Sequence, residues 1–163
     1  MDEKFPFRDS ASQQEAAILG LLEGGKFCLE LTEERPQVAA LKVLVIDDNL
    51  PYAAGLAELL ELGGFSASYV LTGEDGIEST YRLGVDAVIL DMNLPDINGF
   101  EVCRRLRRDP RTAHVAVIFH TTKGSVPGAR HEADAFLGFP IPMDQVYTVI
   151  RRTVEQRRLR FFR

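Results

Sequence analysis

The feature that most constrains the fold is a set of three almost continuously apolar runs. They are KVLVID at 42–47, AVILD at 87–91 and VAVIFH at 115–120. A strand with one wet face alternates apolar and polar residues, whereas a continuously apolar strand is buried on both faces, as in a parallel sheet covered by helices. Together with two further strands at 67–71 and 135–138, these runs predict a five-stranded α/β sheet.

Helix-like segments fill the intervals between the strands. Asn49 and Pro51 form a start signal for the first helix, and Thr72 is a cap for the second. The segment between the last two strands, KGSVPGARHEAD, contains two glycines and a proline, so we expect its helix to be short or irregular. The other predicted helices span about 50–62, 72–83, 99–109 and the residues from about 143 onward.

Residues 1–40 do not fit this repeat. SQQEAAILGLL favours a short amphipathic helix, and KFCLELT favours a strand. A piece of this size is too small to bury a core of its own. We therefore divide the chain into an N-terminal extension, 1–40, and a domain, 41–163, with the extension packed on the domain or on a second copy of it.

Composition narrows the setting. Cys28 and Cys103 lack disulfide-type or metal-type spacing, which favours a reducing compartment and a cytoplasmic location. No apolar run approaches the roughly 18 residues of a membrane span. The net charge of −5 gives no general attraction for nucleic acid, so no direct nucleic-acid partner is expected. The arginines that crowd the last thirteen residues indicate a solvated helix face or, alternatively, an anionic partner.

Three carboxylates are predicted to meet at one edge of the sheet. Asp47 and Asp48 end the first strand, and Asp91 ends the third. Ligands of open parallel sheets bind outside the carboxyl ends of the strands. Two carboxylates about 4 Å apart repel by roughly 4 kcal/mol at an effective dielectric constant near 20. A divalent cation would relieve this repulsion, and all-oxygen ligands favour Mg²⁺. The alternative is that one or two of these acids simply cap helices.

The stretches VLVIDDN, LTGEDGIE, AVILDMNLPDINGFEVCRRLR and DPRTAHVAVIFHTT resemble the receiver domain of two-component response regulators. The resemblance covers residues 41 to about 155. It implies a doubly wound, flavodoxin-like parallel sheet with strand order 2-1-3-4-5.

The resemblance also implies the chemistry of the acids. Asp91 would accept a phosphoryl group from a histidine kinase or a phosphotransfer protein. Asp48, Asp91 and the backbone carbonyl of Asn93 would bind Mg²⁺ directly, and Asp47 would act mainly through water. Positioning and charge neutralisation suffice for such a transfer.

Switch residues follow from the same resemblance. Thr121 matches the hydroxyl that binds the phosphoryl group, and Phe136 matches the aromatic side chain that responds to it.

His120 is interpreted as a core or lining residue rather than a ligand. The family has a Lys-Pro pair after the fifth strand, but this chain has Phe139 before its proline. Lys123 could supply the missing charge, or it could be a plain solvent-exposed lysine.

These observations predict a stand-alone receiver that signals through protein contacts, with no catalysis beyond its own phosphorylation and dephosphorylation. In the family that this chain resembles, partners contact the face formed by the fourth helix, the fifth strand and the fifth helix. The irregular fourth helix and Phe139 change that face here, which favours a homodimer that uses residues 1–40 and Phe161-Phe162. The first alternative is a pseudo-receiver that binds partners independently of phosphorylation, for which Phe139 is the evidence. A remote alternative is a Mg²⁺-dependent phosphatase of the haloacid dehalogenase type. That class needs an aspartate two residues after the nucleophile, where Asn49 follows Asp47 here.

Overall fold

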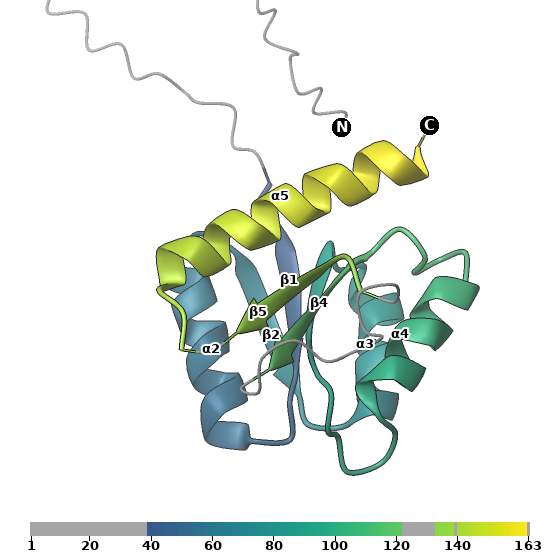
Figure 1. Cartoon of the computed structure of the whole chain (residues 1–163), viewed down its shortest axis with the longest axis horizontal. Coiled ribbons are helices and arrows are strands. Elements are labelled where there is room, and N and C mark those ends of the chain that lie inside the picture. Colours follow the sequence, from purple (N-terminus) through teal and green to yellow (C-terminus); the bar gives the residue numbers. More distant parts are fainter. Residues whose placement is uncertain (1–38, 122–132, 139, 163) are drawn as a thin grey trace, which may run out of the picture. The chain divides into compact units, whose positions relative to one another are not determined.

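The computed structural model describes residues 39–121, 133–138 and 140–162, with the backbone alone for Thr121. Five strands form one sheet in the order β2-β1-β3-β4-β5, and every neighbouring pair is parallel (Figure 1). The predicted flavodoxin-like strand order is thus confirmed. The elements are β1 Lys42–Ile46, α2 Leu50–Leu62, β2 Ser66–Val70, α3 Gly73–Leu83, β3 Ala87–Asp91, α4 Gly99–Arg108, β4 Ala116–Thr121, β5 Ala135–Gly138 and α5 Met143–Phe161.

The central strands are buried on both faces, as their continuous apolar character predicts. Val43, Leu44 and Val45 in β1 are at most 1% exposed, and residues 87–90 of β3 are equally buried. Alternate side chains enter two separate cores because successive residues of a strand point to opposite faces.

Helices close both cores (Figure 1). α2 and α5 cover the face that carries Val43 and Val45. The opposite face, which carries Leu44 and Ile46, packs mainly on α4 and partly on Ile77 of α3. Among the helices in the described ranges, none is both long and apolar enough to cross a bilayer.

Three helices that each follow a strand begin with a side-chain cap. The side chains of Asn49, Thr72 and Asn98 accept hydrogen bonds from the backbone N–H groups of Tyr52, Asp75 and Glu101 at 3.2, 3.2 and 2.9 Å. Such caps satisfy N–H groups that the first turn of a helix leaves unpaired. The amino ends of α2, α3 and α4 therefore lie at the edge of the sheet where the strands end, which is also the edge of the acids.

Two predictions can be judged only in part. The extension 1–40 lies outside the described residues except for Ala39 and Ala40. The short helix predicted in 123–134 lies outside them except for Ala133 and Asp134. β4 begins one residue later than predicted, and α5 extends over 19 residues to Phe161.

Candidate metal centre

The register of the central strands brings two of the predicted acids together. β1 and β3 are neighbours with Ile46 opposite Leu90, so Asp47 and Asp91 follow side by side. On the other flank of β3, Asp91 is opposite His120 of β4. One ligand atom from each of Asp47, Asp91 and His120 lies within 4.8 Å of the others. The sheet thus gathers two carboxylates and one imidazole at its carboxyl edge.

Asp47 is held in place from two sides. Its side chain is almost fully buried, and its Oδ1 accepts a hydrogen bond from the backbone N–H of Asn49 at 2.9 Å. Its Oδ2 lies 3.4 Å from His120 Nδ1. Because both oxygens have defined neighbours, the direction in which this carboxylate points is fixed before any ligand arrives.

Asp91 is half-buried and electrostatically strained. Burial raises the pKa of its carboxyl above the ordinary value, and the neighbouring charge of Asp47 adds to the rise. Hydrogen bonds from the backbone N–H groups of Met92 and Asn93 act in the opposite direction, the latter at 3.2 Å to Oδ2. A nearby cation would favour the ionised form of Asp91, so the pair of acids fits a divalent metal.

The other two predicted metal ligands, Asp48 and Asn93, are exposed. The Asp48 side chain is exposed, and within the described ranges it does not belong to the cluster of close ligand atoms. Asn93 is exposed as well, and its backbone N–H donates to Asp91. Direct metal binding by Asp48 and by the Asn93 carbonyl stays a prediction.

The loop after Asp91 is tightly closed by backbone contacts. The N–H of Gly99 donates to the Met92 carbonyl at 3.0 Å. A Cβ atom at Gly99 would lie 2.5 Å from the Asp91 carbonyl oxygen, so only glycine allows this approach. Asp96 then ties the loop to α3 by accepting from the N–H groups of Gly73 and Glu74, both at 2.9 Å.

Sequence reasoning did not assign this role to Asp96. Hydrogen bonds from the N–H groups of Glu74 and Gly73 lower the pKa of Asp96 to about 2. A carboxylate at the amino end of a helix also interacts favourably with the helix dipole. The contact joins residues more than twenty positions apart, and no local pattern in the sequence reports it.

His120 lines the site, which agrees with its interpretation from the sequence as a core or lining residue. Its side chain is buried, and its ring stacks on the ring of Tyr52 with centroids 4.8 Å apart and planes 7° from parallel. Burial, and then the charges of Asp47 and Asp91, raise the pKa of Tyr52, which keeps the phenol neutral near physiological pH. The stacked rings of Tyr52 and His120 therefore form an aromatic wall beside the acids.

Of the two predicted switch residues, Phe136 lies on the face of the sheet opposite the acids, and Thr121 is described by its backbone alone. Phe136 is half-buried and packs against Phe119, with ring centroids 5.7 Å apart. The backbone of Thr121 is opposite Gly138 at the end of β4. Lys123 and Phe139 lie outside the described residues, so their predicted roles are untested.

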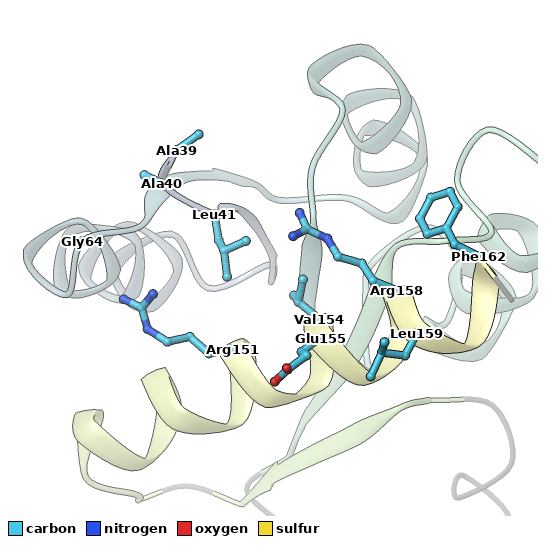
Figure 2. Close-up of a pocket in the computed structure, with 10 residues that line it drawn as sticks. All are labelled: Ala39, Ala40, Leu41, Gly64, Arg151, Val154, Glu155, Arg158, Leu159 and Phe162. Atoms are coloured by element: carbon cyan, nitrogen blue, oxygen red, sulfur yellow. The ribbon is translucent and has the colours of Figure 1, made fainter. Parts of the chain in front are cut away.

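A cavity of about 640 Å³ lies at the opposite edge of the sheet. Leu41 precedes β1 and Gly64 precedes β2, and both line this cavity together with Arg151 and Val154 of α5 (Figure 2). The acids follow the other ends of the strands. This cavity therefore does not serve the acid cluster.

Comparisons with known proteins agree with this geometry. The family model described as response regulator receiver domain matches residues 43–151. The DNA-binding dual master transcriptional regulator RpaA of Synechocystis is 33% identical over 115 residues, which cover 68% of this chain and 47% of that protein. The chain thus spans about half the length of such curated relatives.

Solved structures show the same fold. A receiver domain from Methylobacillus flagellatus is 27% identical with a TM-score of 0.64, over 71% of this chain and 99% of that one. The receiver domain of a Pseudomonas aeruginosa sensor histidine kinase is 21% identical with a TM-score of 0.64, over 72% and 99%. That structure has a magnesium ion coordinated in its active site cleft.

Proposed function

We propose that Asp91 accepts a phosphoryl group from a histidine kinase or a phosphotransfer protein, because the chain belongs to the response regulator receiver domain family. One observation carries the proposal: Asp91 ends a central strand beside the buried Asp47, at the carboxyl edge of the sheet. Burial and the charge of Asp47 raise the pKa of Asp91, so a nearby cation would favour its ionised form.

In the proposed transfer, a carboxylate oxygen of Asp91 attacks the phosphorus of a phosphohistidine. An O–P bond forms, the N–P bond breaks, and the electron pair returns to the imidazole of the donor. The backbone N–H of Asn93 already donates to Oδ2 of Asp91 and holds the carboxylate in one orientation. A Mg²⁺ held by Asp47 and Asp91, together with the predicted ligands Asp48 and the Asn93 carbonyl, would supply neutralisation of the phosphoryl charge.

The signal would leave the domain through protein contacts. Thr121 and Phe136 are the proposed switch residues. Phe136 packs on Phe119, so a change in the rotamer of Phe136 would alter the packing of the core that α4 covers. We expect no catalysis beyond phosphorylation and dephosphorylation of Asp91. The stand-alone arrangement stays a prediction, since the curated relatives are about twice as long as the matched segment. A homodimer and a cytoplasmic location stay predictions as well.

A second candidate is a pseudo-receiver that binds partners independently of phosphorylation. The observation in its favour is the sequence itself, which has Phe139 where the family has a lysine. Without that amine, a phosphoryl group on Asp91 loses a charge-assisted hydrogen bond, typically worth about 1.5–3 kcal/mol.

The test uses a small acyl phosphate donor with Mg²⁺ and follows the mass of the intact chain. Wild type should gain one phosphoryl group, and Asp91→Asn should gain none. Asp109→Asn is a matched control because Asp109 follows α4 at the other edge of the sheet, and it should react like wild type. Equal labelling of wild type and Asp91→Asn, or no labelling of either, would overturn the proposal. Labelling with no change at β5 in nuclear magnetic resonance spectra would favour the pseudo-receiver.

A further inference from the structure

We infer that His120 joins Asp47 and Asp91 as a further protein ligand of the metal, and that the imidazole gives the site a preference for a divalent first-row transition ion over Mg²⁺. The inference rests on the proposed metal site and specifies the cation that it takes. Oxygen-only sites suit Mg²⁺, whereas an imidazole nitrogen suits ions such as Zn²⁺, Ni²⁺ and Fe²⁺.

The position of His120 in β4 makes this contact possible. Asp91 and His120 are opposite each other in the ladder between β3 and β4. Alternate side chains share a face of a sheet, and Ile118 lies in the core covered by α2 and α5 together with Val45 and Ile89. The side chain of His120 therefore continues the same face as the two acids.

The distance between the ligand atoms fits one shared ion. His120 Nδ1 and Asp47 Oδ2 are 3.4 Å apart. Two ligands that each lie about 2.0–2.1 Å from a tetrahedral zinc are themselves about 3.3–3.4 Å apart. Asp91 completes a set whose ligand atoms lie within 4.8 Å of one another.

The surroundings hold the imidazole in place. His120 is 5% exposed, and Tyr52 covers one face of its ring in a nearly parallel stack. A buried ring with a fixed plane has little rotational freedom to lose when it binds an ion. Asp47 is likewise fixed by the N–H of Asn49, so two of the three ligands are preorganised.

The competing interpretation is that His120 only orients Asp47 through a hydrogen bond. Glutamine can still donate such a bond, but it lacks the imidazole nitrogen. The variant His120→Gln therefore separates a ligand from a positioning residue.

The experiment titrates the full chain with Zn²⁺ and with Mg²⁺ by calorimetry, for wild type and for His120→Gln. We expect the dissociation constant for Mg²⁺ divided by that for Zn²⁺ to fall by about tenfold or more in the variant. A loss of this size is typical when a metal ligand or its direct support is removed. His114→Gln is the matched control, since His114 lies beside Phe161 of α5, and it should keep the wild-type ratio.

A second measurement detects metal binding at His120 in the wild-type protein itself. In ¹⁵N spectra of the histidine rings, Zn²⁺ should shift a nitrogen of His120, and Mg²⁺ should not. An unchanged affinity ratio in His120→Gln, or no Zn²⁺-dependent shift of His120 in wild type, would overturn the inference. If Asp91 is still phosphorylated with Mg²⁺ in that case, the proposed function stands; if no cation binds and Asp91 gains no phosphoryl group, both fail.

Discussion

At the scale of single residues, the site is a compromise between burial and charge. Asp47 and Asp91 lie close together with limited access to water, and the buried imidazole of His120 lies beside them. The raised pKa of Asp91 records the cost of keeping its carboxylate ionised in the folded protein. Such a cost is typical of functional sites, where it is offset when the ligand binds.

Asp91→Asn should stabilise the metal-free protein at neutral pH. A raised pKa means that the folded state binds the Asp91 proton more tightly than the unfolded chain, so stability is lost as the pH rises through the folded pKa. Asparagine removes this loss. We expect a gain of under about 1 kcal/mol at pH 7 in chelator after solvent screening is allowed for. The gain should vanish below the ordinary aspartate pKa of 3.8.

Urea unfolding at several pH values checks this expectation. Added metal should reverse the order, because it binds and stabilises the wild type only. The exposed Asp144 provides the control Asp144→Asn, which should show no such pH-dependent gain. A wild-type chain as stable as Asp91→Asn at every pH would contradict the assigned strain.

Phe139→Lys should raise the phosphorylated fraction at a fixed concentration of acyl phosphate. A new charge-assisted hydrogen bond of about 1.5–3 kcal/mol corresponds to roughly a tenfold or greater change in the equilibrium. Phe139→Met, which changes shape without adding charge, is the control. The measurement is the fraction of phosphorylated chain by mass spectrometry. If the lysine has no effect, the missing amine is not the defect, and Lys123→Ala tests whether Lys123 supplies the charge.

At the scale of elements, the loop between β3 and α4 sets the geometry of the site. Gly99 packs against the backbone of Asp91, and Asp96 pairs with the amino end of α3. The end of β3, at Asp91, is thus connected to α3 and α4 by backbone and side-chain hydrogen bonds. The ends of the loop are joined by the hydrogen bond from the N–H of Gly99 to the Met92 carbonyl.

Gly99→Ala should destabilise the protein by about 1–3 kcal/mol, the usual range for overpacking against atoms that cannot move freely. The obstructing atom is the backbone oxygen of Asp91, 2.5 Å from the added Cβ. Gly55→Ala is the matched control within α2, where a Cβ meets nothing within 4 Å, and it should stabilise by about 0.5–1 kcal/mol. Thermal unfolding of both variants distinguishes them. Similar shifts in the same direction would contradict the close approach.

At the scale of the whole described domain, one carboxylate joins the two helical layers. Asp134 accepts hydrogen bonds from Arg107 of α4 at 2.5 Å and from Arg157 of α5 at 3.3 Å, and also from the N–H of Val117 at 2.9 Å. α4 and α5 cover opposite faces of the sheet. Asp134 therefore connects both layers at the start of β5.

Asp134→Asn should destabilise the protein by about 3–5 kcal/mol, because two partly buried guanidinium groups lose their shared counter-charge. The matched control is Asp109→Asn, which removes the partner of the exposed Arg111 and should cost little. Urea unfolding midpoints give the comparison. Equal losses in the two variants would show that the position of Asp134 between the layers contributes nothing.

The sequence by itself determined the strands, the caps and the acids, since each depends on neighbours along the chain. Continuous apolar runs predicted the central strands, and Asn49 and Thr72 predicted helix starts that the structure confirms. Only the tertiary structure decided that His120 lies opposite Asp91 and that Asp96 reaches α3. Strand register and long-range hydrogen bonds follow from how side chains pack across the sheet, and a one-residue slip would turn His120 to the other face.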